Sequence, residues 1–472
     1  MRKSLYRKIL LKWLKKIENV LAIWRWRNLS TAGKITVFKS LAFSKIVFIS
    51  YLNSIPTTII QKLENIQKDF IWNGKSAKIK HTTLISDYIY GGLKAIDIKS
   101  KFDSLHLSWI KRLYNDNFHP WKCIPQRFIQ DKYKFDIFFP NAHIEMHEKC
   151  PKFYKSMASA WSNVTQDPLT AKTAASQKVW FNKFIKIGGK PVTELFPLQI
   201  FVGDFFNGNK LATWLFFTNK YKLHNSDHFK WIQLVNAIPK TWIRLVENEA
   251  DTWDKNIFSE QHLMLLTRQL PLEKLTSKQL YAILIHQIKK PPTSQEKISS
   301  ILNVSVNNWN EIYTLARKVA VDSYTRMFQY KCSQNILYLN NQLSKMNLSN
   351  TDKCSLCNTH KETIKHLFYD CLKTKTLWLS LKNRLNMQLP ELTPESAFFG
   401  FPNADNALLA HLHLIFKTAI YTGREKGDCN LEYIVNRIKQ TRKIEENIVY
   451  LNSAAKERNK EKWACLNRIL PR

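Results

Sequence analysis

The chain has 472 residues with 44% hydrophobic content, which is enough to bury more than one core. Its 72 Lys and Arg outnumber 37 Asp and Glu, and the formal charge of +35 favours a polyanionic partner, with nucleic acid as the leading class. The charged amino-terminal residues exclude a secretory signal, and the lack of an apolar run of transmembrane length excludes a membrane span, so an intracellular protein of the nucleus or cytoplasm is expected.

Residues 1–75 are expected to form a compact helical bundle. With only 11 Gly and 16 Pro, the chain as a whole favours long helices over many-stranded sheets. The first helix has an apolar stripe at steps of three and four residues, formed by Ile9, Trp13, Ile17, Val20 and Trp24. Basic residues fall largely away from that stripe, namely Arg7, Lys8, Lys12, Lys15 and Lys16.

Two further helices complete this predicted bundle. Ser30 or Thr31 caps the second helix, which ends before Pro56, and Thr57 or Thr58 starts the third. The apolar positions of the second helix are Ile35, Phe38, Ala42 and Ile49, and those of the third are Ile59, Leu63, Ile66 and Phe70.

Residues 76–290 predict a middle region of mixed, irregular α+β structure. The segment 78–86 is strand-like, and Gly91-Gly92 forces a turn before the next helix. That helix places five apolar residues on one face, Ile98, Phe102, Leu105, Trp109 and Leu113. Asp204 lies alone in FVGDFF without a visible partner, and we interpret it as incidental to any chemistry.

The carboxy-terminal part divides at Lys289-Lys290-Pro291-Pro292, followed by Thr293 and Glu296 at capping-box spacing. We expect a helical segment at 291–350, a small zinc-knuckle module at 351–390 and a charged, amphipathic helical tail at 391–472. The fold class is therefore predicted to be mainly α with short strands.

The clearest chemical motif is Cys354-x2-Cys357-x8-His366-x4-Cys371. Three thiolates and one imidazole satisfy tetrahedral Zn²⁺ and leave no open position, so the predicted site is structural and not catalytic. His360 is an alternative ligand to His366. We prefer His366, because the adjacent Leu367 and Phe368 can anchor it in a core. The alternative interpretation is three unrelated buried thiols beside a surface histidine.

The remaining cysteines do not form a disulfide framework. They are widely spaced, as expected of small buried hydrophobic residues in a reducing compartment: Cys123, Cys150, Cys332, Cys429 and Cys465.

Residues 325–371, TRMFQYKCSQNILYLNNQLSKMNLSNTDKCSLCNTHKETIKHLFYDC, resemble the carboxy-terminal zinc-knuckle region of reverse transcriptases from non-LTR (LINE-class) retrotransposons. Residues 21–56 resemble the thumb of those enzymes, residues 70–98 resemble the segment after it, and residues 230–242 resemble their middle region. The family polymerases use palm carboxylates that include an Asp-Asp pair, and no such pair occurs here. The resemblance therefore implies a truncated, non-catalytic carboxy-terminal part that helps to hold RNA and DNA during target-primed reverse transcription.

The candidate nucleic-acid contacts lie in two places. Thumb-like candidates are Lys12, Lys15, Lys16, Arg25, Arg27, Lys34 and Lys39, and Lys361 and Lys365 flank the zinc motif. The alternative for the basic face is that it is only solvated and contacts no nucleic acid. Trp24 either stacks on a base or is buried in the core. The alternative for the zinc module is a purely structural role, in which it binds no ligand other than zinc. Competing functions are a part that completes a polymerase on another chain, and a membrane-surface or protein-interaction protein. Other retrotransposon proteins are candidate partners.

Overall fold

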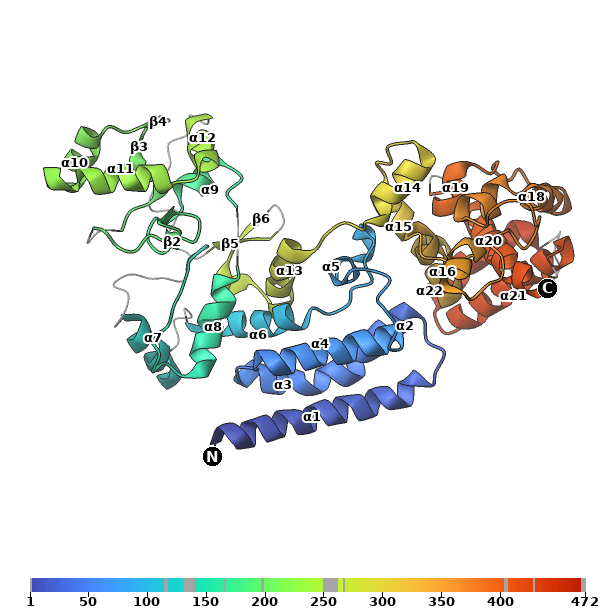
Figure 1. Cartoon of the computed structure of the whole chain (residues 1–472), viewed down its shortest axis with the longest axis horizontal. Coiled ribbons are helices and arrows are strands. Elements are labelled where there is room, and N and C mark those ends of the chain that lie inside the picture. The colour runs from blue at the N-terminus through green and yellow to red at the C-terminus, as the bar shows by residue number, and fades with distance from the viewer. Residues whose placement is uncertain are drawn as a thin grey trace. The chain divides into compact units, whose positions relative to one another are not determined.

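A computed structural model describes residues 2–113, 118–130, 139, 141–164, 167–196, 199–248, 262–265, 268–402, 406–427 and 429–467. These residues are mainly helical, and the strands form three two-stranded antiparallel sheets, which confirms the predicted fold class (Figure 1). The chain divides into two compact units. Unit 1 comprises Met1–Lys15, Phe43–Glu64 and Asp97–Ile288, and unit 2 comprises Lys16–Ala42, Asn65–Ile96 and Lys289–Arg472. Residues 1–75 are thus shared between the units.

Helix α1 (Arg2–Arg25) forms where expected, but its buried stripe differs from the prediction. The buried positions are Leu10, Leu14, Ile17 and Leu21, whereas Ile9 is 42% exposed and Trp13, Val20 and Trp24 are half-buried. The observed stripe has the same helical period but is rotated, because the core that receives the helix takes the Leu row in place of the row that carries the bulky indoles.

The next helical segment begins at Ser30, whose side chain accepts the Gly33 N–H at 3.1 Å and caps the helix as predicted. It runs through α2 (Thr31–Val37), the π-helical turn η1 (Phe38–Phe43) and α3 (Ser44–Leu52), and α4 (Thr57–Trp72) follows. The expected apolar positions are buried except Ile49 and Ile66, which are half-buried.

Thr31–Leu52 is long and apolar enough, by length and composition alone, to cross a membrane. This corrects the expectation that no segment of the chain meets that criterion. Several of its side chains are buried within the protein, namely Ile35, Phe38, Ala42, Phe43 and Ile46.

Unit 1 has two apolar cores. The first packs α6 (Ile98–Leu113), α8 (Lys152–Ser162) and α13 (Ser277–Ile288) together, and α6 buries four of its five predicted apolar residues, with Trp109 half-buried. Nearby elements are η3 (Pro120–Lys122), α7 (Cys123–Gln130), β5 (His262–Leu265), β6 (Arg268–Pro271) and η7 (Leu272–Lys274).

The second core of unit 1 lies in the region that the sequence left unassigned, between residues 171 and 248. Its elements are α9 (Ala171–Ala175), β1 (Lys186–Ile187), β2 (Lys190–Pro191), η4 (Val202–Phe205), β3 (Phe206–Asn207), β4 (Lys210–Leu211), α10 (Trp214–Tyr221), η5 (Asn225–Asp227), α11 (His228–Ala237) and α12 (Lys240–Asn248). Asp204 is fully buried here, pairs with Lys220 at 3.0 Å and accepts the Phe201 N–H at 2.9 Å. It therefore has a structural partner, which the sequence did not reveal.

The second segment of unit 2, Asn65–Ile96, differs from the prediction at residues 78–86. The expected strand is instead a short helix, α5 (His81–Leu84), followed by η2 (Tyr88–Tyr90). The predicted Gly91-Gly92 turn is confirmed, because Gly91 has a φ of +76° and a Cβ on Gly92 would lie 2.0 Å from the Ser86 carbonyl oxygen. The predicted capping box is absent, since Thr293 makes no side-chain cap hydrogen bond.

The carboxy-terminal helices of unit 2 surround α20 (Ala407–Lys426), which is buried over most of its length (Figure 1). This corrects the expectation of a charged amphipathic tail, because α20 packs against α15, α16, α21 and α22 as a core helix. The elements are α14 (Ser294–Leu302), α15 (Trp309–Val319), α16 (Ser323–Ser333), α17 (Asn340–Leu343), η8 (Ser344–Met346), η9 (His366–Asp370), α18 (Leu372–Leu385), α19 (Pro394–Phe399), α21 (Leu431–Val449), α22 (Ser453–Trp463) and η10 (Ala464–Leu466).

Two fully buried histidines on α20 predict acid sensitivity of unit 2. Burial holds the pKa of His411 and His413 well below the usual value, with Lys462 and Lys417 acting in the same direction. Below about pH 6.5 the unfolded chain binds protons that the native histidines do not, so the free energy of unfolding falls as pH drops, with a slope that approaches about 1.4 kcal/mol per pH unit for each histidine. Urea unfolding between about pH 7 and about pH 5.5 measures this slope.

The matched comparison uses glutamine in place of histidine. The His411→Gln/His413→Gln variant should show a shallower pH slope than the wild type, whereas His147→Gln, at an exposed position, should leave the slope unchanged. An identical slope in the double variant would contradict the assignment.

Candidate metal centre

The four predicted ligands come together in unit 2. The Sγ atoms of Cys354, Cys357 and Cys371 and a ring nitrogen of His366 all lie within 4.8 Å of one another. Cys357 Sγ is 3.3 Å from His366 Nε2. Eighteen consecutive residues therefore place four soft or borderline donors around one point, as a tetrahedral metal site requires.

Local backbone hydrogen bonds form the turn that carries the first two cysteines. The Asn358 N–H donates to the Cys354 carbonyl at 2.8 Å, and Asn358 has a φ of +57°, which asparagine tolerates. The Cys354 N–H donates to the His360 carbonyl at 2.8 Å, and Lys353 forms an antiparallel bridge with Lys361. These backbone hydrogen bonds fix the conformation of the turn that carries Cys354 and Cys357.

The second pair of ligands lies on and directly after η9. The His366 N–H donates to Thr363 Oγ1 at 3.0 Å, and the Cys371 N–H donates to the His366 carbonyl at 2.8 Å. Leu367 and Phe368 are fully buried, in agreement with the proposed anchoring of His366. A π-helical turn is rare and often occurs at functional sites, and here it brings His366 and Cys371 to the same side.

His360 is not a member of the group. Its side chain is exposed, its Nδ1 is 2.8 Å from Thr359 Oγ1, and its ring centre is 5.4 Å from that of His366. The geometry therefore favours His366 over the alternative ligand.

The protonation chemistry of the thiols suits a metal. A hydrogen bond from the Cys354 thiol lowers the pKa of Cys371 to about 5, and the same hydrogen bond together with burial raises the pKa of Cys354. Burial alone would raise the pKa of Cys357, but hydrogen bonds from His360, Thr359 and His366 lower it to about 6. Metals bind thiolates and displace such a shared proton, so this donor set fits Zn²⁺.

The other cysteines only partly match their prediction. Cys150 and Cys332 are buried and Cys429 is half-buried, but Cys123 and Cys465 are exposed. The first two are therefore small core residues, whereas the two exposed thiols are surface positions.

A buried ion pair beside the cluster was missed by sequence reasoning. Glu362 is fully buried, and its carboxylate accepts the Arg424 Nη1 hydrogen bond at 2.6 Å. The same carboxylate accepts the backbone N–H groups of Ser355 and Asn340, each at 2.9 Å. Since Ser355 lies between the first two cysteines, Glu362 connects the metal-binding turn to the core helix α20. No sequence pattern signals this pair, because Arg424 is 62 residues away.

A second group of potential ligands joins Asp322, His411 and Glu445 within 4.8 Å of one another. One Glu445 oxygen already accepts Lys462 Nζ at 2.6 Å and Trp463 Nε1 at 3.2 Å, and the other accepts the Val321 N–H at 2.6 Å. The Lys462 ammonium is thus the cation of this group, which connects α20, α21 and α22.

The predicted nucleic-acid contacts are mostly exposed. Exposed positions are Lys12, Lys15, Lys16, Arg25, Arg27, Lys39 and Lys361, and Lys365 is half-buried. Lys34 differs, because only 6% of it is exposed and its ammonium donates to Asn73 Oδ1. Its pKa is lowered by burial and then by Arg25, so Lys34 belongs to the interior and not to an accessible basic surface.

Residues 276–378 match the family described as zinc-binding in reverse transcriptase. The match includes all four members of the cluster and covers less than half of the chain. None of the curated protein sequences compared with the chain is similar to it. The chain therefore contains a zinc-binding region related to that of reverse transcriptases, and the described core around this region extends beyond the match into α19, α20 and α21.

Proposed function

We propose that this chain is a nucleic-acid-binding, carboxy-terminal part of a LINE-class reverse transcriptase that grips RNA and DNA and carries no polymerase chemistry of its own. The observation that supports it best is the metal cluster inside a region related to the zinc-binding part of reverse transcriptases. The large positive charge adds the required attraction to a polyanion.

Zinc in this proposal is held by Cys354, Cys357, His366 and Cys371 and acts as a structural ion. Four protein ligands leave no position for a substrate, so the ion supplies folding free energy and no reactive group. The residues around it then keep Lys361 and Lys365 at the edge of a fixed module.

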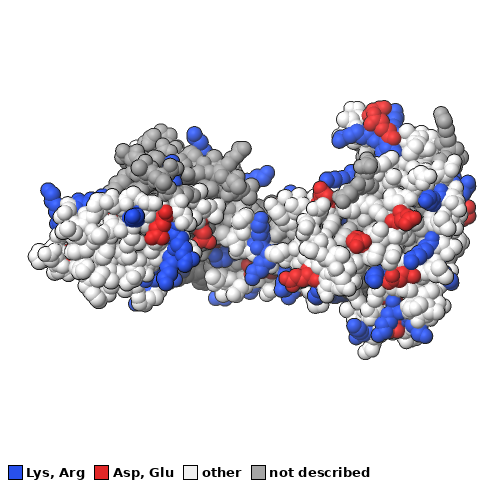
Figure 2. Space-filling model, turned by 90° about the horizontal axis from the view of Figure 1, so that it is seen from above, with Lys and Arg blue, Asp and Glu red and all other residues white. Residues whose placement is uncertain are grey.

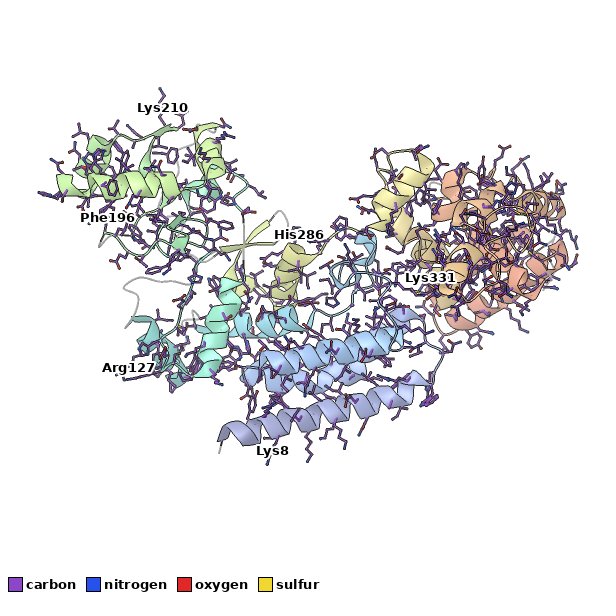
Figure 3. All side chains as sticks on the ribbon, in the orientation of Figure 1. Lys8, Arg127, Phe196, Lys210, His286 and Lys331 are labelled. Atoms are coloured by element: carbon purple, nitrogen blue, oxygen red, sulfur yellow. The ribbon has the colours of Figure 1, made fainter. Side chains whose placement is uncertain are left out.

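The basic face of α1 is the proposed phosphate-binding surface. It consists of Lys8, Lys12, Lys15 and Lys16, which share one side of the helix and are all exposed. At 3.6 residues per turn this side is opposite to the buried stripe, and Figure 3 marks it with Lys8. A row of lysines facing solvent suits sequence-independent contact with a phosphate backbone.

Neutralising this face should weaken binding in a salt-dependent way. In the Lys12→Gln/Lys15→Gln/Lys16→Gln variant, the slope of log affinity against log salt should fall by about 2 to 3, since each phosphate contact contributes somewhat under one unit. Fluorescence anisotropy with single-stranded RNA and with duplex DNA measures the slope.

The control removes the same charge from the hairpins of unit 1. Lys186→Gln/Lys190→Gln/Lys210→Gln changes three exposed lysines, of which Lys210 is labelled in Figure 3. Figure 2 shows basic and acidic side chains interspersed on the face in view. Because both variants lose three positive charges, a purely non-specific charge effect would change both salt slopes equally. Equal slopes in the two variants would contradict a role for α1.

A further inference from the structure

Unit 2 contains a cavity that the metal centre does not use. Its volume is about 380 Å³, within the range of small-ligand sites. The walls come from residues 28–36 at the start of α2, from η2 and the following Gly92 and Leu93, and from α15 and α16. All of these residues belong to unit 2, where α15 contacts both η2 and α16, and Figure 3 locates α16 by its labelled Lys331.

The cavity is positively charged. Its lining includes Arg317 and Arg326 and, among the described residues, neither Asp nor Glu. Arg326 Nε donates to the Ala320 carbonyl at 2.8 Å, and in the described part of the chain neither arginine forms a carboxylate ion pair within 4.0 Å. Two guanidinium groups at one cavity repel each other, and a bound anion would relieve that repulsion.

The electrostatics of Arg326 agree with this geometry. Its pKa is lowered first by burial and next by the positive charge of Arg317, while Asp322 and Glu445 act in the opposite direction. Because arginine keeps its charge in proteins, the native state carries the unfavourable electrostatic energy of this partly buried guanidinium group. Binding of an anion in the cavity would reduce that energy.

The cavity also offers a flat surface for an aromatic ligand. The Arg317 guanidinium carbon lies 3.2 Å from the ring centre of Tyr88, so the ring supports the guanidinium plane. Nucleic-acid bases commonly stack on arginine planes. Asn28 and Ser323, both exposed members of the lining, have side chains without a hydrogen bond in the described structure and can meet polar base or sugar groups.

We propose that this cavity binds one unpaired nucleotide of an RNA or DNA strand, with its phosphate between Arg317 and Arg326 and its base against the Arg317 plane. This inference rests on the proposed nucleic-acid binding and adds to it a preference for single-stranded or frayed ends. A paired base inside a duplex could not enter, because its faces are already stacked.

The test measures binding of the full chain to a short single-stranded RNA, to a blunt duplex of the same sequence and to free AMP. In Arg317→Gln, affinity for the single strand should fall about tenfold, as expected for loss of one stacked and charge-paired nucleotide. Duplex affinity should change no more than in Arg384→Gln, which removes an exposed arginine of α18 outside the cavity. Arg317→Lys, which keeps the charge and removes the plane, should show an intermediate loss.

The outcomes separate the two proposals. If Arg317→Gln and Arg384→Gln weaken single-strand binding equally while the wild type binds both nucleic acids, the cavity assignment is wrong and the general function stands. If AMP binding depends on Arg317 but strand binding does not, the cavity takes a free nucleotide, and the strand assignment is again overturned. If the wild type binds neither RNA nor duplex, the proposed function itself fails. Unchanged metal content and melting temperature in each variant confirm that folding is intact.

Discussion

Replacing Cys354 by serine should reduce bound zinc from about one per chain to near zero and should unfold the metal-binding part of unit 2. Cys354 is fully buried and lies in the same apolar core as Phe368 and Phe416, so the metal and the core stabilise one another. Metal binding contributes on the order of 10 kcal/mol in isolated zinc modules, which is comparable to the whole stability of a typical domain. Elemental analysis and calorimetry measure the two effects.

Two matched variants keep this prediction specific. Cys465→Ser changes an exposed cysteine of the same unit, and His360→Asn removes the histidine that lies beside the cluster but outside it. Both should retain zinc and a wild-type melting temperature. Full zinc content in Cys354→Ser, or loss of zinc in His360→Asn together with its retention in His366→Asn, would show that the ligand set is misassigned.

Glu362→Gln should be the most destabilising substitution outside the ligands. It leaves Arg424, whose side chain is only 2% exposed, without its buried charged partner. It also places an amide N–H₂ group, which is a donor, beside backbone N–H groups that need an acceptor. Removing one member of a buried ion pair typically costs about 3 to 5 kcal/mol. Chemical denaturation monitored by tryptophan fluorescence measures the loss, and metal affinity should fall as well because Ser355 loses its acceptor.

The neighbouring Glu425 provides the control. Its side chain is 58% exposed and lies 3.4 Å from Arg424 Nη2, so Glu425→Gln makes the same chemical change on the other side of the same arginine. An exposed pair contributes about 1 kcal/mol or less. Equal effects of the two substitutions would rule out the buried ion pair as the connection between the turn and α20.

The sequence predicted features whose cause is local. The Ser30 cap, the Gly91-Gly92 turn and the cluster from Cys354 to Cys371 all depend on residues that lie close together in the sequence, within eighteen positions for the cluster. The spacing of the cysteines determines which side chains can meet a single ion, and the structure brings those four together.

Features that depend on distant partners were not predictable in the same way. Helix α20 contains His411, His413 and Lys417, which suggest a surface helix, yet neighbouring helices cover all three. Lys417 donates to Gln329 Oε1 at 3.0 Å from 88 residues away, so its burial depends on a contact that periodicity cannot reveal. The rotation of the α1 stripe has a similar origin, because the choice between two apolar rows depends on the core that receives them.

Native mass spectrometry of the full chain with a short single-stranded RNA, recorded from about 50 to about 200 mM ammonium acetate, tests the central claim most directly. The account predicts one zinc ion per chain at every salt concentration, and an RNA complex that is abundant at the low end and largely dissociated at the high end. A chain that carries no metal and forms no complex at the lowest salt would contradict both the metal centre and the attraction to nucleic acid.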